Sequence, residues 1–111
     1  MSTSRFASQD DIRLLRQLQE YEITLKEARI MHGDTPALDA VEECIRAIRT
    51  SLAPDILGRY DRLSKAGPGI VSVKDGMCMG CYIMIPRGDL NRIAAGKADP
   101  ACPNCGIYVA T

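Results

Sequence analysis

The fold of this chain is decided by two stretches, Cys78-Met79-Gly80-Cys81 and Cys102-Pro103-Asn104-Cys105, which are separated by twenty residues. Two Cys-x-x-Cys pairs at such a separation are typical of four thiolates arranged tetrahedrally around one metal ion. The two-residue gap lets one tight turn aim both sulfurs of a pair at a common point. Catalytic zinc sites keep one position open for water, so the pattern predicts a closed structural zinc site with four ligands: Cys78, Cys81, Cys102 and Cys105.

The composition is that of an ordinary globular protein. The 111 residues allow one domain plus an appendage, and 46% of them are apolar. Lys and Arg together number fourteen, as do Asp and Glu, so nucleic-acid binding would require a local basic patch. Neither a run of 18 apolar residues nor a secretory signal is present. We therefore expect a cytoplasmic protein without membrane contact, whose paired cysteines bind metal rather than form disulfides.

Residues 1–66 predict an antiparallel helical hairpin. Ser8, followed by Asp10 and Asp11, is a candidate N-cap for a helix over about residues 6–32, which Gly33 ends. This helix carries a heptad seam of Leu14, Leu18, Tyr21, Leu25 and Ala28.

A second helix is predicted over about residues 36–65. Thr35-Pro36 has the form of a cap followed by proline at the first helical position, and Pro54 predicts a kink or restart. The seam that would face the first helix consists of Leu38, Val41, Ile45, Ile48 and Leu52.

Residues 67–111 predict a small zinc ribbon, beginning with the linker Gly67-Pro68-Gly69. Strand-like periodicity covers residues 70–73 and 82–85, with a turn at Asp75-Gly76 between them. A short helix over residues 89–95 and a final apolar run over 107–109 complete the ribbon. The predicted fold class is therefore α+β, a helical hairpin followed by a four-cysteine ribbon.

Several stretches together resemble a known family. Residues 56–63 (ILGRYDRL), Gly76-Met77-Cys78-Met79-Gly80-Cys81, Ile85-Pro86 and Cys102-Pro103-Asn104-Cys105-Gly106 make the chain similar to the bacterial C4-type zinc ribbon proteins with an N-terminal coiled coil. The likeness is specific over residues 54–108. It implies a coiled-coil hairpin carrying a ribbon with the four cysteines as zinc ligands. It further implies a regulatory role through nucleic-acid or protein binding; some members are linked to flagellar or secretion regulation through transcription factors or messenger RNA.

Two features depart from that family. Its members usually have a much longer coiled-coil arm, whereas here the chain turns back at Gly33-Asp34-Thr35-Pro36. Family members also tend to place a basic residue after the last glycine, where this chain has Ile107. Functions that reside on the distal arm, or on that basic contact, are not implied for this chain.

Four cations of the C-terminal half are candidate contacts for a partner or a nucleic acid: Lys74, Arg87, Arg92 and Lys97. The alternative is ordinary solvated charge. Tyr82 and Tyr108 would stack on bases or pack over the sheet. Met77, Met79 and Met84 would form a soft partner-binding surface or shield the sulfurs from water.

The first predicted helix carries a second apolar stripe opposite its seam, made of Ile12, Ile23 and Ile30. A second subunit would cover this stripe in a homodimer; alternatively, these are isolated surface isoleucines. Cys44, beside the seam of the second helix, is expected to be a small buried hydrophobe.

Three function classes follow. The favoured one is a non-catalytic adaptor or regulatory protein with structural zinc, which binds protein or nucleic acid. The alternative is a rubredoxin-like iron electron carrier, because the same four thiolates can hold one iron. An enzyme is disfavoured, since the sequence has no catalytic motif and its one histidine, His32, lies at the hairpin turn.

Overall fold

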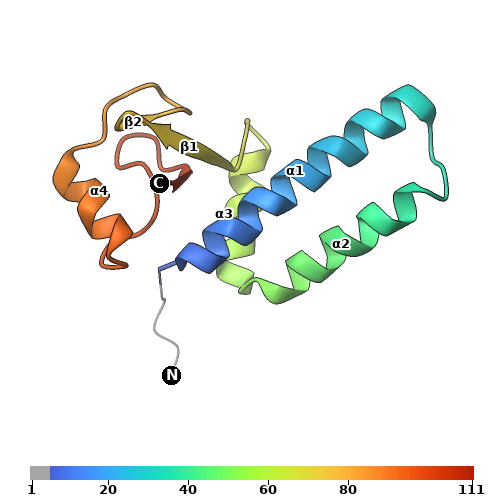
Figure 1. The fold of residues 1–111 in the computed structure, drawn as a ribbon, viewed down its shortest axis with the longest axis horizontal. Helices are drawn as coiled ribbons and strands as arrows, with labels where there is room; N and C mark the ends of the chain where they lie inside the picture. The colour runs from blue at the N-terminus through green and yellow to red at the C-terminus, as the bar shows by residue number, and fades with distance from the viewer. Residues whose placement is uncertain (1–5) are drawn as a thin grey trace.

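The computed structural model describes residues 6–111. The three N-terminal helices lie on one side of a small sheet, and the rest of the four-cysteine ribbon lies on the other side (Figure 1). The fold is α+β, as predicted: α1 and α2 pack together at the N-terminus, and the sheet and ribbon follow. No helix among the described residues combines the length and apolar character needed to cross a bilayer. The division of the chain into domains at residue 66 stays a prediction.

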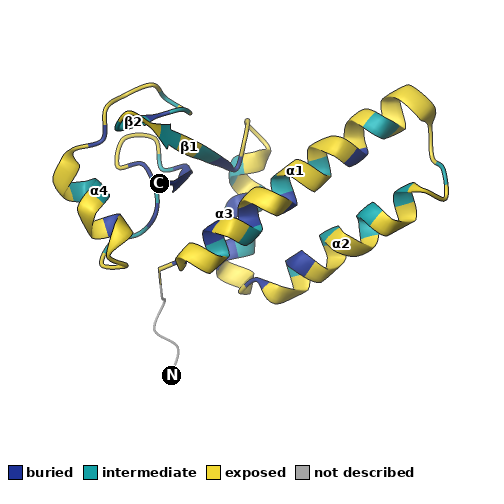
Figure 2. Ribbon diagram, in the orientation of Figure 1, coloured by how far each residue is buried: buried dark blue, intermediate teal, exposed yellow. Residues whose placement is uncertain are grey.

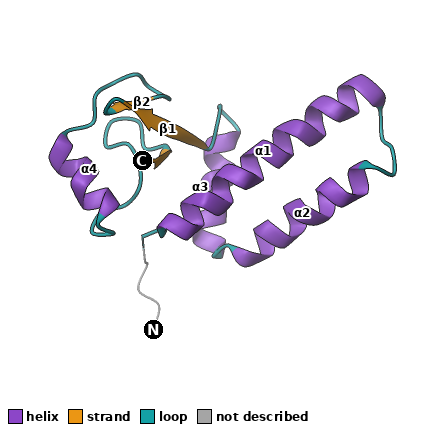
Figure 3. Ribbon diagram, viewed as in Figure 1, coloured by secondary structure: helices purple, strands orange, loops and turns teal. Residues whose placement is uncertain are grey.

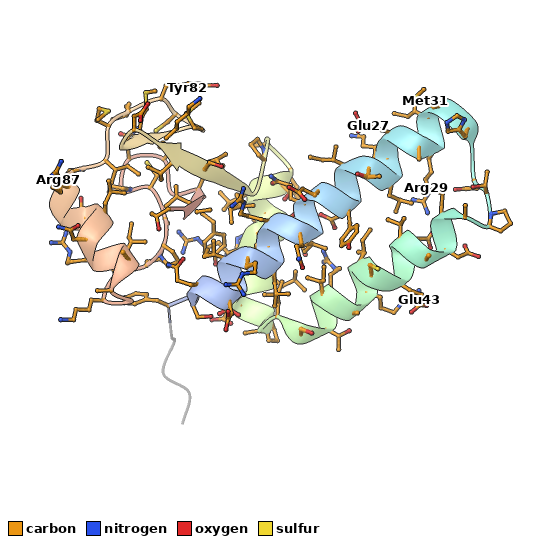
Figure 4. All side chains as sticks on the ribbon, in the orientation of Figure 1. Glu27, Arg29, Met31, Glu43, Tyr82 and Arg87 are labelled. Carbon is orange, nitrogen blue, oxygen red and sulfur yellow. The ribbon has the colours of Figure 1, made fainter. Side chains whose placement is uncertain are left out.

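Helix α1 (Gln9–His32) begins directly after the predicted cap Ser8, three residues later than the predicted start, and ends before Gly33 as predicted. The Ser8 hydroxyl accepts a hydrogen bond from the amide of Asp11, and the Asp11 carboxylate accepts one from the amide of Ser8, which completes a capping box. At the other end Gly33 has a φ of 70° and donates its amide to the carbonyl of Arg29. The Arg29 side chain turns toward α2 and pairs with Asp34 and Glu42, which closes the hairpin (Figure 4).

The helical segment expected over residues 36–65 restarts at Pro54, one of the two outcomes predicted there, and so consists of α2 (Leu38–Ser51) and α3 (Pro54–Ser64). Ala53 is extended, with a ψ of 142°, because the residue before a proline is disfavoured in the helical region. Leu52, which ends α2, is also extended, with a ψ of 146°. Pro54 is the first residue of α3, where its missing N–H costs nothing. Helix α3 therefore restarts in a new direction and passes behind α1 toward the ribbon (Figure 1).

The sheet has three strands in the order β2-β1-β3. Strand β1 (Ile70–Lys74) pairs antiparallel with β2 (Met77–Cys78) through Asp75 and Gly76, whose φ values of 53° and 79° fit a two-residue hairpin turn. Strand β3 (Tyr108–Ala110) runs parallel to β1 on its other side. The ribbon also contains α4 (Arg87–Ala94), and loops make up most of the remainder (Figure 3).

The strand predicted over residues 82–85 is wrong. Only Met84 makes a bridge, to Met77, and the hairpin partner of β1 is β2 instead. Tyr82 has a φ of 61°, which no strand tolerates, because its amide donates to the Cys78 carbonyl at 2.7 Å in the turn around the first cysteine pair. The geometry of the cysteine turn therefore overrides the β-propensity of this run.

The sheet separates two hydrophobic cores, because alternate residues of a strand face opposite sides. Ile70 pairs with Tyr108, and both pack against the helices. Their neighbours Val71 and Val109, paired one residue further along, pack instead in the core of the ribbon. Buried residues accordingly gather where α1, α3 and the sheet meet, whereas the far ends of α1 and α2 are mostly exposed (Figure 2).

The Gln19 side chain joins α1 to the start of β1. Its amide oxygen accepts hydrogen bonds from the amides of Gly69 at 2.8 Å and Ile70 at 3.2 Å, and its amide nitrogen donates to the Ile70 carbonyl at 2.9 Å. Gly69 is needed at this junction, since a Cβ there would lie 2.5 Å from the Tyr60 ring. The ribbon is thus attached to the helices by hydrogen bonds between the Gln19 side chain and the backbone as well as by apolar packing.

Two predictions about exposure are wrong. Ile12 is only 3% exposed, because the first turns of α1 lie between the other helices and the sheet, so the exposed stripe is reduced to Ile23 and Ile30. Cys44 is exposed on α2 rather than buried, because it lies outside the seam that faces α1.

A polar cluster connects α1, α2 and α3. The hydroxyl of Tyr60, a residue only 1% exposed, donates to the Glu22 carboxylate at 2.7 Å. Arg49 donates to both Asp61, at 2.6 Å, and Glu22, at 3.3 Å. Burial, and then Glu22, raise the pKa of Tyr60 well above its usual value, so this hydroxyl is a donor throughout the physiological range.

Replacing Tyr60 by Phe should therefore lower the free energy of unfolding by about 1.5 kcal/mol, the usual cost of losing a hydrogen bond to a charged group. Urea titration followed by circular dichroism measures this change. Tyr21→Phe is the matched control, because the Tyr21 hydroxyl makes no hydrogen bond within residues 6–111, and it should change stability by less than about 0.5 kcal/mol. Equal losses in the two variants would contradict the role of the Tyr60 hydroxyl.

Candidate metal centre

Two turns with the same backbone arrangement present the four cysteines. In the first, the Tyr82 amide donates to the Cys78 carbonyl at 2.7 Å, and in the second the Gly106 amide donates to the Cys102 carbonyl at 2.8 Å. The amide of each first cysteine donates in turn to the carbonyl five residues later, of Ile83 or Ile107, at 3.1 and 2.9 Å. The sequence predicts the two turns but not this detailed correspondence.

Further amides in both turns point at sulfur. The Gly80 amide lies 3.4 Å from the Cys78 sulfur, and the Asn104 amide lies 3.4 Å from the Cys102 sulfur. Such hydrogen bonds stabilise a thiolate and orient it toward a metal. Each Cys-x-x-Cys pair is therefore prepared as a two-sulfur ligand.

The four sulfurs converge on one point. The distance from the Cys78 sulfur to the Cys105 sulfur is 3.8 Å, that from Cys81 to Cys102 is 3.7 Å, and all four atoms lie within 4.8 Å of one another. Four sulfurs that each bind zinc at about 2.3 Å are about 3.8 Å apart in a tetrahedron. The four cysteines predicted from the sequence are thus positioned to bind one metal ion.

The thiols differ in acidity. Burial and neighbouring thiols raise the pKa of Cys105 to about 12, and burial raises that of Cys78. Burial also opposes ionisation of Cys81, but hydrogen bonds from the Asn104 side chain and the Ile83 backbone lower the pKa of Cys81 to about 7. A cation that binds all four sulfurs must therefore displace protons, at least from Cys78 and Cys105.

Apolar side chains enclose the centre on its inner side. Cys78 and Cys102 are buried beside Ile85, Ile93 and Val109, whereas Cys105 is exposed. The only group of metal-ligating side chains found within the described residues is the one formed by the four cysteines.

Arg59 of α3 supports the second turn, and the sequence interpretation assigned it no role. Its guanidinium donates to the Asp99 carboxylate at 2.6 Å and to the Gly106 carbonyl at 3.0 Å, and it lies over the ring of Tyr108, 4.7 Å from the centroid. Arg59 lies within residues 56–63, which resemble the family, and this resemblance was the only sequence feature that could have indicated its role. Tyr108 is 2% exposed beneath it and cannot stack on a base, so that alternative is wrong for Tyr108.

The four candidate cations do not share one environment. Arg92 forms an ion pair with Asp89 one turn earlier in α4. Within residues 6–111 Lys74, Arg87 and Lys97 make no ion pair. Lys74 ends β1, Arg87 begins α4 and Lys97 follows α4, so the cations are distributed over the ribbon. A contact between any of them and a partner stays a prediction.

Comparison with known proteins supports the interpretation of this site. Residues 77–106 match the family model described as the C4-type zinc ribbon domain, which includes all four cysteines and α4. This confirms the family resemblance for the ribbon; helices α1, α2 and α3 lie outside the matched segment. Searches of the curated proteins and of the solved structures found no match.

Arg59→Leu should release metal from the loaded protein about tenfold faster, because the second cysteine turn loses the donor to its Gly106 carbonyl. Transfer of metal to a coloured chelator in a stopped-flow experiment measures the rate. Arg62→Leu is the control, since Arg62 is exposed on the same helix and makes no ion pair within the described residues. Identical release rates for the two variants would show that Arg59 does not support the site.

Proposed function

We propose, on the premise that residues 77–106 form a C4-type zinc ribbon domain, that this chain is a non-catalytic binding protein whose ribbon is held in shape by one zinc ion. The observation that carries the proposal is the convergence of four sulfurs at the spacing that a tetrahedral zinc ion requires. Four protein ligands leave no coordination position for substrate or water, which favours a structural role for the metal. The paired thiols suit a reducing compartment, so we place the protein in the cytoplasm.

Zinc is favoured over iron by the family match, because four thiolates alone suit both metals. An iron centre in the same site would make the protein a rubredoxin-like electron carrier. The two proposals differ in colour and redox behaviour, which makes them easy to separate.

Function is expected on surfaces rather than at the metal. The resemblance to bacterial C4-type zinc ribbon proteins suggests an adaptor or regulator in transcription that binds a protein or a nucleic acid. Lys74, Arg87 and Lys97 are available for such a partner, whereas Arg92 is engaged by Asp89. Ile23 and Ile30, exposed by 51% and 76%, remain candidates for contact between two copies of the chain.

Zinc should also stabilise part of the helical region. Ile70, Tyr108 and Ala110 belong to the core of the helices, yet their strands pair within the ribbon sheet. A ribbon of this size has too small a core to fold stably without its metal. Loss of zinc should therefore unfold the ribbon and loosen the N-terminal half of α1 with it.

The purified protein should contain one zinc per chain, and removal of zinc by a chelator should remove amide-exchange protection from residues 70–110. Cys81→Ser should lose most of the zinc, because a hydroxyl is a poor replacement for a thiolate ligand. Cys44→Ser is the matched control: Cys44 is exposed on α2 outside the site, so zinc content should be unchanged.

Elemental analysis and hydrogen exchange measure these outcomes. A red protein that contains one iron and shows a reversible redox couple would replace the zinc proposal by the electron-carrier alternative. Full zinc retention in Cys81→Ser would contradict the four-cysteine site itself.

A further inference from the structure

Three consecutive apolar side chains project from the loop after the first cysteine turn. Tyr82 is 66% exposed, Ile83 48% and Met84 61%. Their backbone is nevertheless fixed, since the Tyr82 amide, the Ile83 carbonyl and the Ile85 amide all form hydrogen bonds with residues 76–78. Figure 4 shows Tyr82 at the outer edge of the ribbon. Ordered apolar groups that remain in solvent are typical of an interaction surface.

The second cysteine turn has the same backbone arrangement as the first, so the side chains at equivalent positions of the two turns can be compared. Gly106 occupies the position equivalent to Tyr82, with φ of 79° against 61°, and Ile107 after it is buried, only 9% exposed. Glycine adopts this left-handed conformation freely, whereas a tyrosine there is strained. The first turn therefore has a strained tyrosine where glycine would be more stable. The exposed aromatic ring of this tyrosine points to a role in binding.

Strand register adds a second part to this surface. Lys74 lies opposite Met77 in the β1–β2 pair, and Met77 lies opposite Met84, so these three side chains share one face of the sheet. Val73 and Cys78, the next pair, face the ribbon core. Met77 and Met84 are thus on the face away from Cys78, which argues against a shielding role for them.

This face is the continuation of the one that the helices cover. Alternation along β1 places Ile70, Ser72 and Lys74 on the same side; Ile70 is buried against the helices, whereas Ser72 and Lys74 are exposed. A hollow of about 450 Å³ lies at the transition, with Lys74 of β1, Met79 of the first cysteine turn and Arg16 of α1 among its lining residues. The uncovered part of the face is therefore open to a segment lying beside α1.

The charges around this surface select the partner. Lys74 and Arg87 make no ion pair within residues 6–111, and Arg87 begins α4 just after the exposed loop (Figure 4). The acidic neighbours are Asp75 in the turn and Glu20 of α1, which lines the same hollow as Lys74. An incoming segment that carries carboxylates would satisfy both cations. Two cations are few for a phosphate backbone, and Tyr82 is the one aromatic ring of this surface, since Ile83 and Met84 offer no stacking plane for bases.

We propose that Met77, Tyr82, Ile83 and Met84, here called the knuckle patch, dock an acidic amphipathic segment of another protein. Apolar side chains of that segment cover the patch, and its carboxylates face Lys74 and Arg87. The flexible methionines adapt to the shape of the segment, and the fixed tyrosine is the anchor. This inference rests on the proposed function, because zinc must hold the first cysteine turn in shape.

The test uses the full-length, zinc-loaded chain as bait for a phage-displayed library of random 16-residue peptides. We expect enrichment of peptides that combine large apolar residues with Asp or Glu. The best synthetic peptide, measured by fluorescence anisotropy, should bind Tyr82→Gly at least about tenfold more weakly. Glycine suits the left-handed backbone at this position, so the variant should retain full zinc content and at least the original stability.

Two further variants sharpen the result. Lys74→Glu combined with Arg87→Glu should also weaken the peptide at least about tenfold and should shift the selected peptides toward Lys and Arg. Ile30→Ser, at the exposed far end of α1, should leave peptide affinity unchanged. Amide chemical shifts should change for residues 74–87 on titration with the peptide.

Failure of the selection to enrich any peptide, or equal affinity for Tyr82→Gly, would overturn the proposal. So would binding of a 20-nucleotide oligo(dT) or oligo(U) at the same residues, which would assign the patch to nucleic acid. Zinc content measured on the same samples separates the two hypotheses. A chain that lacks zinc refutes the proposed function, whereas a zinc-loaded chain that ignores peptides refutes only the docking inference.

Discussion

The constraint on which the rest of the structure depends is the meeting of four sulfurs within 4.8 Å. The two cysteine pairs lie in turns that are twenty residues apart in the sequence, so the chain between them must fold back to bring the second pair next to the first. Helix α4 takes up part of that return, and the pairing of β1 with both β2 and β3 places the two turns side by side. The convergence of the four sulfurs and the pairing of the three strands are thus geometrically linked.

The sheet transmits this constraint to the helices. Its register directs Ile70 and Tyr108 to the core of the helices, whereas Val71 and Val109 pack in the core of the ribbon. Gln19 and Arg59 then fix the helices to the ribbon by polar contacts at either end of this interface. A helical hairpin of this length has little core of its own, so the ribbon serves it as a supporting surface.

Local signals in the sequence predicted local structure well. The Ser8 cap, the Asp75-Gly76 turn and the four ligands depend on short-range geometry and could be found from residue spacing. The errors arose where tertiary contacts decide. Tyr82 is forced out of a strand by the hydrogen bond to Cys78, and Ile12 is buried by elements that a helical wheel cannot show. Arg59 was missed because its partners lie forty or more residues away.

The comparison between the two cysteine turns separates what the metal requires from what this chain has added. Both turns need a left-handed residue after the second cysteine, and Gly106 meets that need at no cost. Tyr82 meets it with strain, and metal binding alone gives no reason for that choice. Because the side chains after Gly106 turn inward and those from Tyr82 to Met84 turn outward, the second turn completes the core, whereas the first presents a surface. In the proposed function the metal would therefore act indirectly, by holding these exposed apolar side chains in one conformation.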